Sequence, residues 1–563
     1  MEQGYMIFLF IAAAIVISII VSVYSKMKRM RDLKDKIAYS WGKTPKQKYK
    51  EEDFKRIKDY HINKTENIED RNVIDDITWN DIDMDNIFKR MNSTQSSIGE
   101  EYLYDMLRRP VFDQSILNQR EKLIELFSNN KGLREKLQLF LGKVGKTDAS
   151  NISNYFFNKN KYRGKAFIFK ILSATAFIAP FLCFINVGLG VTLTLGMLVM
   201  NIIIHFNVKS QIGWQLEVLA FIINMVSKAK KLSNENIPEL KEYNETLRDN
   251  LKDIYKITRK AFFLFTISNN DLFTEYFRIA FLREAIEYET VMTTLKTHGE
   301  NFLKIYEVFG LLDSMISVAS YRKSLQYYTN PELYNKAGSK NKRLSFTDLY
   351  HPLIEEPVPN SISIDKSVLL TGSNASGKST FLKTVAINAI FAQTINTCLA
   401  KEYKSDYFMV FSSMALKDNL LGNESYFVVE TKSLKRILDY LNEEVSCLCF
   451  VDEVLRGTNT IERVAASSQI LYHLSQSNCL CFAATHDIEL SYTLADDYSN
   501  YHFQERIEEG NIIFDYKLYE GRSNTRNAIK LLSIIGYNEG VVKCAESMAN
   551  YFLSEGKWKA ANQ

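Results

Sequence analysis

This chain of 563 residues has few prolines, few cysteines and a small net charge. With 8 prolines, 46% hydrophobic and 24% charged residues, the chain is neither collagen-like nor disordered as a whole. Its seven cysteines show no CxxC spacing, which excludes the usual zinc or dithiol site and indicates buried, reduced thiols typical of the cytosol. The formal net charge of +4 is too small to indicate a nucleic-acid or acidic-lipid partner by itself. The length implies three or four structural units of about 150 residues.

Charged residues are missing from a stretch near the N-terminus, which runs from Tyr5 to Tyr24. As a helix it would be roughly 30 Å long, so we predict a membrane-spanning helix over residues 1–24. The alternative is a cleaved signal peptide, but no basic residue precedes the apolar run. By the positive-inside rule, the chain after this span is expected to be cytoplasmic. The basic residues behind that expectation are Lys26, Lys28, Arg29, Arg31, Lys34 and Lys36.

Acidic residues are absent from a second apolar stretch, residues 166–206, whose basic groups are Lys170 and His205. As a helix it would span roughly 60 Å, or two bilayer crossings, so we predict a transmembrane hairpin that reverses within residues 186–190. The alternative is a buried hairpin in a soluble core. The predicted hairpin has basic residues at both ends, which puts both ends in the cytoplasm. They are Lys159, Lys161, Arg163, Lys165 and Lys209.

The rest of the chain consists of three kinds of sequence: a polar segment, a segment with helical periodicity, and a segment in which strands and helices alternate. Residues 25–76 are predicted to form a cytoplasmic linker. Within it, residues 43–76 are polar and mixed in charge without a clear apolar period, which predicts either a tether or an exposed helix. Apolar residues at spacings of three and four then predict an all-α domain in two halves, residues 77–165 and 207–335. From Leu344 onward, short β-rich runs alternate with helical stretches, so we predict an α/β domain over residues 336–563.

A glycine-rich loop follows the first of these strands, Ser367–Thr371, and an apolar helical run follows the loop. Its sequence fits GxxxxGKS, whose backbone N–H groups cradle phosphates. We expect Lys378 to contact the β and γ phosphates and the Ser379 hydroxyl to bind Mg²⁺. The alternative is a turn that only caps a helix. The predicted nucleotide-binding residues are Gly372, Ser373, Asn374, Ala375, Ser376, Gly377, Lys378, Ser379 and Thr380.

Two further strands end in groups suited to phosphate chemistry. The strand over residues 447–451 ends in Asp452 and Glu453, at the sheet edge where open α/β sheets bind ligands. Asp452 is predicted to hold Mg²⁺ and Glu453 to polarise the attacking water, unless the pair only caps the next helix. His486 follows the strand over residues 479–484 and is predicted to donate to the γ phosphate, or else to be structural.

Taken together, the segments TGSNASGKST, CLCFVDEVLRGTNT and ATHDIEL resemble the ATPase domain of the MutS family, a branch of the ABC ATPases. The likeness covers roughly residues 78–150 and 300–550, through MNSTQSSIGEEYLYDMLRRPVFDQSILNQR, LLDSMISVASY and LYHPLIEEPVPN. It implies an α/β P-loop ATPase domain and an all-α core/lever domain, to which the predicted spans add three transmembrane helices. It also implies hydrolysis of ATP with Mg²⁺.

The resemblance also implies a dimer with composite sites, either a homodimer or a dimer with a paralogue. Ser425, in ESYFVVE, is then the signature serine that reaches the partner's γ phosphate, and residues 456–458 cross between the two sites. The segment GRSNTRNAIKLLSIIGY resembles the helices that lock MutS dimers. Pro357 stands where the family often has an aromatic residue that stacks on adenine.

Mismatch recognition is not part of the resemblance. In the family, an N-terminal domain carries a Phe-x-Glu wedge. Here such triplets occur at residues 273–275 and 503–505, inside the helical and ATPase parts, where we expect structural roles. A Smr-type nuclease tail is not seen after residue 550. The hairpin lies where the family has its DNA-gripping clamp, so the lever is expected to connect the ATPase to the bilayer.

The leading hypothesis is a multi-pass cell-membrane protein with a cytoplasmic, dimeric MutS-type ATPase and a family-level role in DNA binding, mismatch repair or recombination. Basic residues that could meet DNA phosphates, or simply be solvated, are Lys336, Lys340, Lys342 and Arg343. The alternative is an ATP-driven switch that acts on a membrane or protein partner without DNA. Half of an ABC transporter is disfavoured, because the predicted spans are few and no LSGGQ sequence occurs.

Overall fold

The chain forms two compact units in the computed structural model. The helical unit comprises residues 1–71, 91–106 and 122–324, and the α/β unit comprises residues 72–90, 107–121 and 325–563. The structure describes residues 20–560 except 22, 26, 69–71, 150, 158–163, 257, 260–278, 335–341, 374–375, 415–425, 442–444, 457, 509–510, 524–527 and 559. The predicted first span therefore lies almost entirely outside the described residues. The predicted combination of a helical part with an α/β domain is confirmed.

The helical unit is built from long helices, as the spacing of apolar residues predicts. Residues 27–40 are helical and precede the named elements. Asn130 illustrates how these helices begin, because its side chain accepts a hydrogen bond from the Leu133 N–H (3.0 Å) and caps α7. The elements are α2 (Glu51–Asn67), α5 (Ser97–Arg108), α6 (Gln114–Asn129), α7 (Lys131–Val144), α8 (Asn154–Phe157), α9 (Ala166–Ile178), η1 (Ala179–Phe184), α10 (Val187–Ser233), η2 (Pro238–Leu240), α11 (Lys241–Leu251), α14 (Arg283–Thr297) and α15 (Gly299–Lys323). The end of α5 and the first half of α6 fall within residues 107–121 and are counted with the α/β unit.

The prediction of a tether or exposed helix over residues 43–76 is wrong for α2. Tyr60 of this helix is fully buried, and the Arg56 side chain is nearly so. Arg56 forms an ion pair with Glu100 of α5 (2.9 Å). The polar composition is misleading because the inward face of α2 packs through charged and aromatic groups that find partners, rather than through aliphatic side chains alone.

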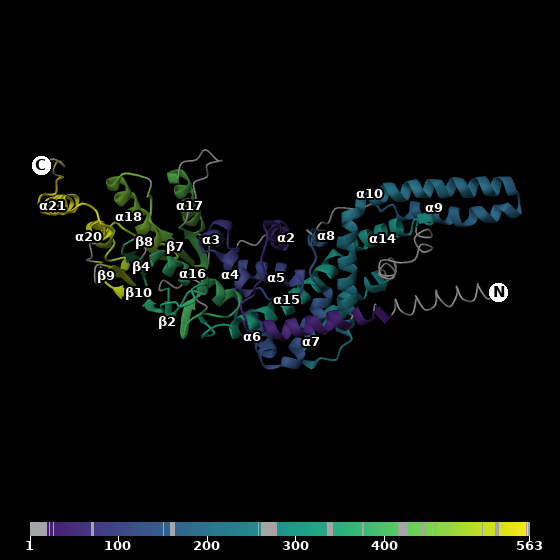
Figure 1. The fold of residues 1–563 in the computed structure, drawn as a ribbon, viewed down its shortest axis with the longest axis horizontal. Helices are drawn as coiled ribbons and strands as arrows, with labels where there is room; N and C mark the ends of the chain where they lie inside the picture. The colour runs from purple at the N-terminus through teal and green to yellow at the C-terminus, as the bar shows by residue number, and fades with distance from the viewer. Residues whose placement is uncertain are drawn as a thin grey trace. The chain divides into compact units, whose positions relative to one another are not determined.

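The apolar stretch over residues 166–206 forms two helical arms, α9 with η1 and the first part of α10, which lie side by side (Figure 1). The chain reverses at Ile185 and Asn186, and the Asn186 side chain caps α10 by accepting from the Leu189 N–H (3.1 Å). Gly190 allows the arms to meet, because a Cβ there would overlap the backbone nitrogen of Cys183. The second arm does not end at residue 206, since α10 continues to Ser233.

Both arms are long and apolar enough to cross a membrane by length and composition. The candidate spans are Ala166–Phe184 and Val187–Gly213, with mean hydropathies of 2.0 and 2.2 in their most apolar windows. Only 11% of each window is buried. A helix of a soluble core would be mostly buried, so these arms are not core helices within the described part of the chain.

The α/β unit contains a six-stranded sheet with the order β10-β9-β4-β8-β7-β6 and a four-stranded sheet with the order β1-β5-β2-β3. In the larger sheet only the β9–β10 pair is antiparallel. The strands are β1 (Glu332–Tyr334), β2 (Leu344–Leu349), β3 (Asn360–Ile364), β4 (Ser367–Thr371), β5 (Glu402–Asp406), β6 (Met409–Ser413), β7 (Cys447–Asp452), β8 (Cys479–Thr485), β9 (Tyr498–Glu508) and β10 (Asn511–Glu520). Strands β4, β7 and β8 confirm the three predicted strands, and they are almost wholly buried, as expected of parallel strands covered on both faces.

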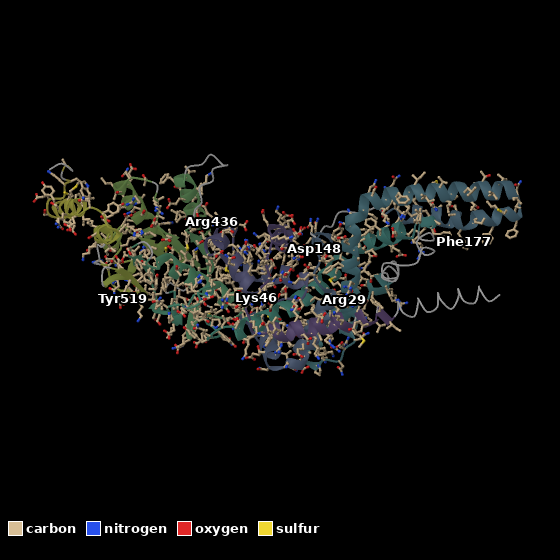
Figure 2. The ribbon with its side chains drawn as sticks, viewed as in Figure 1. Arg29, Lys46, Asp148, Phe177, Arg436 and Tyr519 are labelled. Carbon is tan, nitrogen blue, oxygen red and sulfur yellow. The ribbon has the colours of Figure 1, made fainter. Side chains whose placement is uncertain are left out.

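Helices flank these strands. They are α3 (Asp76–Asp81), α4 (Met84–Met91), α16 (Lys378–Thr394), α17 (Tyr426–Tyr440), α18 (Thr460–Gln476), α19 (Leu490–Thr493), α20 (Ala528–Ile535) and α21 (Glu539–Glu555). Figure 2 labels Arg436 on α17 and Tyr519 on β10. Because β4, β8 and β7 are adjacent and parallel, their carboxyl ends meet at one edge of the sheet.

Residues 72–90 and 107–121 belong to the α/β unit, although their sequence predicts membership of the helical domain. The Asp81 carboxylate of α3 accepts from the Ser412 hydroxyl (2.7 Å) and from the Met414 N–H (2.9 Å), beside β6. The Val111 N–H donates to the Gln393 carbonyl at the end of α16 (2.8 Å). These hydrogen bonds are long-range in sequence, which is why helical periodicity could not assign the segments.

Candidate nucleotide site

The loop between β4 and α16 needs its glycines. Gly372 has φ +145° and Gly377 has φ +105°, both in the region that favours glycine. A Cβ at Gly372 would lie 2.7 Å from the Phe503 carbonyl oxygen. The helix α16 begins directly after the loop, at Lys378, so its first N–H groups face the same space. Asn374 and Ala375 lie outside the described residues.

Lys378 is folded back over this loop. Its ammonium donates to the carbonyl oxygens of Gly372 (2.7 Å) and Ser373 (2.8 Å), and the residue is buried. Burial lowers the pKa of Lys378, and nearby carboxylates, Asp452 first, oppose that shift. The structure thus keeps a cation at the mouth of the loop, where a phosphate would find both backbone N–H groups and a positive charge.

Ser379 and Asp452 come together from separate elements. The Ser379 hydroxyl, in the first turn of α16, donates to Asp452 Oδ2 at the end of β7 in a short contact. Burial raises the pKa of Asp452, and the hydrogen bond from Ser379 opposes that shift. A hydroxyl and a carboxylate are oxygen donors of the kind that Mg²⁺ prefers, so this pair fits the predicted ion.

Glu453 is held in place from both sides. Its backbone has φ +58°, and its N–H donates to the Ala484 carbonyl of β8 (2.9 Å). One carboxylate oxygen lies 2.8 Å from His486 Nε2 and the other 3.0 Å from Arg456 Nε. Burial lowers the pKa of His486, and the charge of Lys378 lowers it further. A non-glycine residue in the left-handed region is strained, which is typical of functional sites.

Sequence reasoning missed Glu430, a buried carboxylate of α17. It accepts hydrogen bonds from the Leu455 N–H (2.5 Å) and the Arg456 N–H (3.3 Å). Burial raises the pKa of Glu430, and these hydrogen bonds oppose that shift. Glu430 therefore ties α17 to the segment that follows Glu453. The available signal was an acidic residue within the otherwise apolar start of a helix, YFVVE.

A cavity of about 370 Å³ opens beside the loop. Its walls include Tyr350, His351, Pro357, Phe503 and Tyr516, together with Gly377 and Thr380. The Tyr516 ring lies against the loop, because a Cβ on Gly377 would lie 3.2 Å from its Cδ1. The volume is in the range of small-ligand pockets, and an aromatic wall suits a planar base.

Tyr516 could not be found from the motif spacing. It lies in β10, where the register with β9 shifts between Phe514 and Leu518, and its φ is +54°. Asn360 fixes this irregularity, because its side chain donates to the Tyr516 carbonyl (3.0 Å) and accepts from the Leu518 N–H (2.8 Å). Pro357, which stands where the family often has an aromatic residue, lines the same cavity. Tyr516 therefore provides an aromatic ring there that the sequence did not predict.

The remaining residues singled out in the sequence are either part of the folded structure around the loop or lie outside the described residues. Ser373 donates to Glu505 (2.7 Å) and Ser376 is buried in the same loop, so both belong to its folded structure. Glu505 and the buried Phe503 are thereby structural, as we expect for that Phe-x-Glu triplet. Residues 273–275, Lys336, Lys340, Ser425 and Gly457 lie outside the described residues.

Lys342 is not available to DNA. It is 9% exposed and donates to the Ser477 carbonyl (3.0 Å). Burial lowers the pKa of Lys342. The suggestion that it meets phosphates is therefore wrong, because burial and a backbone partner hold its ammonium inside the unit. Arg343 is exposed and stays a candidate.

Comparison with known proteins agrees with this geometry. Residues 368–552 match the family model for MutS domain V. The DNA mismatch repair protein MutS of Thermotoga sp. (strain RQ2) is 23% identical over 82% of this chain and 62% of its own length. MutS of Thermotoga petrophila is 30% identical over 46% of this chain and 33% of its own length, and MutS of Staphylococcus haemolyticus is 28% identical over 46% and 30%.

These relatives are distant, and the chain spans less than two thirds of their length. The domain assignment is nevertheless direct, because the matched residues contain the loop, the two carboxylates and His486. MutS domain V is an ABC-type ATPase domain, and such a domain implies the use of ATP and Mg²⁺ in general. The α/β unit thus carries an ATPase domain of the MutS type.

Proposed function

We propose that this protein is a membrane-anchored ATPase of the MutS type, in which ATP binding and hydrolysis drive a dimeric, clamp-like switch. The observation that carries the proposal is the convergence of Lys378, Ser379, Asp452, Glu453 and His486 at one edge of the six-stranded sheet. Lys378 and Ser379 come from the start of α16, and the other three groups lie at or just after the ends of β7 and β8. Together they supply the phosphate-binding, ion-binding and water-activating groups that one subunit contributes to hydrolysis of a nucleoside triphosphate.

Each side chain has a separate role in the proposed reaction. Lys378 and the loop N–H groups bind the phosphates, and Ser379 with Asp452 would hold Mg²⁺, which neutralises phosphate charge when bound. Glu453 polarises the attacking water. Without nucleotide, the His486 Nε2 lies 2.8 Å from the Glu453 carboxylate and orients it, and with ATP bound the imidazole would donate to the γ phosphate instead. Tyr516 and Pro357 flank the base in the adjacent cavity.

A substitution at Glu453 tests the hydrolytic role. We expect Glu453→Gln to retain ATP binding and to lose turnover, whereas Lys378→Ala should weaken ATP binding itself. Both variants are compared with wild type by equilibrium binding of a fluorescent ATP analogue and by phosphate release. Wild-type turnover in Glu453→Gln would contradict the assignment.

Dimerisation is proposed because the resemblance implies that Ser425 completes the partner's site. The C-terminal helices α20 and α21 support it, since they and the residues around them expose large apolar groups. These are Ile535, Tyr537, Val541, Tyr551, Leu553 and Trp558, with exposed fractions of 41–69%. Such a surface is typical of an interface between subunits. A monomeric mass that is independent of ATP, measured by light scattering, would refute the composite site.

Membrane anchoring is proposed from the two arms of the hairpin. Large side chains near the reversal are strongly exposed, with Phe184 at 88% and Ile185 at 84%. Soluble proteins rarely expose apolar surface of this extent, and lipid would cover it. We further propose that residues 1–24 form a third span, that the protein lies in the cell membrane, and that the α/β unit and the part of the helical unit outside the spans are cytoplasmic. Resistance of the full chain to alkaline carbonate extraction tests the anchoring.

At the family level, the proposed role is in DNA binding and mismatch-repair or recombination reactions. ATPase stimulation by homoduplex, mismatched and branched DNA should be measured at several salt concentrations, because phosphate contacts weaken with salt. Absence of both stimulation and binding at low salt would refute the DNA role.

One observation favours the second candidate, a switch that acts on a membrane or protein partner without DNA. α10 runs unbroken from the hairpin reversal into the helical unit, where Leu219, Ile222 and Met225 are buried. A rearrangement of that unit would therefore move the arm directly. Site-specific crosslinking from the hairpin in native membranes should then differ between ATP-bound and nucleotide-free protein. Identical crosslinks in both states would exclude this candidate.

A further inference from the structure

The helical unit contains a second, larger cavity at the base of the hairpin. Its volume is about 980 Å³, and it lies between α9, the start of α14 and the residues Tyr255, Lys256 and Arg259. It is separate from the nucleotide site, whose residues all belong to the α/β unit. Neither the ATPase chemistry nor the proposed dimer uses it.

Positive charge dominates the walls of this cavity. Lys170, Lys256, Arg259 and Arg283 line it, against one acidic group, Glu287. Arg283 lies 3.5 Å from Glu287 in an ion pair. Among the residues that the structure describes, the other three cations have no ion pair. A cluster of cations in a shared hollow repels itself and favours an anionic ligand.

The same cavity has an apolar wall. Phe177, labelled on the first arm in Figure 2, and Ile286 line it beside the cations. Phe177 is 59% exposed and belongs to a candidate membrane span. The ligand that fits must therefore carry negative charge at one end and hydrocarbon at the other.

The position of Lys170 identifies the surroundings of this ligand. Lys170 is the one charged residue of the span Ala166–Phe184, and it lies in its second turn, next to the end predicted to be cytoplasmic. A lysine at this depth reaches toward the headgroup region. Basic pockets between helices on the cytoplasmic side bind anionic headgroups.

We propose that this cavity binds an acidic phospholipid, with its phosphate among Lys170, Lys256, Arg259 and Arg283 and its acyl chains against Phe177 and Ile286. The inference rests on the membrane anchoring of the proposed function. The lipid would fix the base of the hairpin at the bilayer surface and make the protein selective for membranes rich in acidic lipid.

The test uses the full chain, purified in a neutral detergent and mixed with equal mole fractions of phosphatidylglycerol and phosphatidylcholine. Lipids that remain bound are counted by native mass spectrometry. We expect at least a fivefold excess of phosphatidylglycerol on the wild type. The excess should fall to near unity in Arg259→Gln/Arg283→Gln and should survive in Arg259→Lys/Arg283→Lys, which keeps the charges.

A matched control removes two cations elsewhere in the helical unit, Lys209→Gln/Lys241→Gln, and should keep the wild-type excess. Phosphate turnover by each variant verifies folding, because none of these residues belongs to the nucleotide site. An equal loss in the control and cavity variants would overturn the inference, since only net charge would then matter. Efficient displacement of the lipid by glycerol 3-phosphate or by duplex DNA would also overturn it, because acyl chains would not contribute.

Alkaline carbonate extraction of native membranes separates the two levels of the argument. Release of the chain into the soluble fraction would overturn both the proposed membrane anchoring and the proposed lipid site. A chain that stays in the membrane but binds both lipids equally overturns the lipid site alone.

Discussion

Glu430 offers the sharpest test of how the nucleotide site is assembled. Its carboxylate accepts two backbone hydrogen bonds, from Leu455 and Arg456, directly after Glu453. Hydrogen bonds to a charged acceptor contribute about 1.5–3 kcal/mol each. They act on a segment in which Glu453 and Leu455 have φ values of +58° and +57°, and such strained residues cost about 1–3 kcal/mol each. The stabilisation from these hydrogen bonds and the cost of the strained backbone are similar in size. Loss of the carboxylate should therefore let the strained backbone relax.

The expected result of Glu430→Ala is a selective loss of turnover. Glu453 would shift once the segment relaxes, and a displacement of about 1 Å can lower turnover about 100-fold. ATP affinity should change less than about threefold, because the hydrogen bonds that Glu430 makes in the described part of the chain go to Leu455 and Arg456 and not to the phosphate-binding loop or Tyr516. Glu430→Gln keeps a neutral acceptor oxygen and should lose less, about tenfold at most.

Single-turnover phosphate release and equilibrium ATP binding measure the two quantities separately. Asp439→Ala, at the exposed end of α17, serves as the matched control. It removes a carboxylate from the same helix and should retain wild-type turnover. Equal turnover in wild type and Glu430→Ala would refute the reasoning, as would a parallel loss of ATP affinity, which would indicate general unfolding of the site.

Three further predictions follow from separate parts of the structure. Glu453→Gln should lower turnover by a factor on the order of 100 or more while ATP still binds, as measured by phosphate release and filter binding; an unchanged rate would contradict the role of Glu453. Tyr516→Ala should raise the KM for ATP about five- to tenfold with little change in kcat, whereas Tyr516→Phe should be neutral because the ring provides the contact; equal effects of both would exclude stacking. Glu101 is fully buried with the Tyr306 hydroxyl as a donor (2.6 Å), and burial raises its pKa from 4.5 to about 8. The folded state therefore binds more protons than the unfolded chain between these pH values, so stability should fall as pH rises from 4.5 to 8, and Glu101→Gln should flatten the dependence of Tm on pH; a parallel slope in the variant would refute this.

Local motifs predicted which side chains meet at the edge of the sheet, because these residues are close in sequence to three strand ends. The strands β4, β7 and β8 are short apolar runs with clear boundaries, and the loop glycines have conformational requirements that the motif expresses directly. Once the strands are adjacent and parallel, Lys378, Asp452 and His486 must meet at one edge. Periodicity and motif order were sufficient for this part.

Contacts that depend on long-range packing could not be predicted in the same way. The membership of residues 72–90 in the α/β unit rests on Asp81 and its partners beside β6, which are far away in sequence. Tyr516 reaches the cavity only because β10 is irregular and Asn360 holds the irregularity. Neither feature leaves a pattern in the local sequence, since hydrogen bonds to distant backbone groups set both.

The hairpin shows how composition and structure complement each other. Composition alone fits both a membrane hairpin and a buried core hairpin, because each consists of apolar helices. The exposed fractions of the described residues differ along the hairpin and α10: Phe184 and Ile185 are exposed at the reversal, whereas Leu219 and Ile222, farther along α10, are buried. One continuous helix thus changes from an exposed apolar arm to a packed core element without a break. Because water does not favour an exposed apolar surface of this kind, the first part of α10 motivates the proposed anchoring in a bilayer, whereas its second part belongs to the packed helical unit.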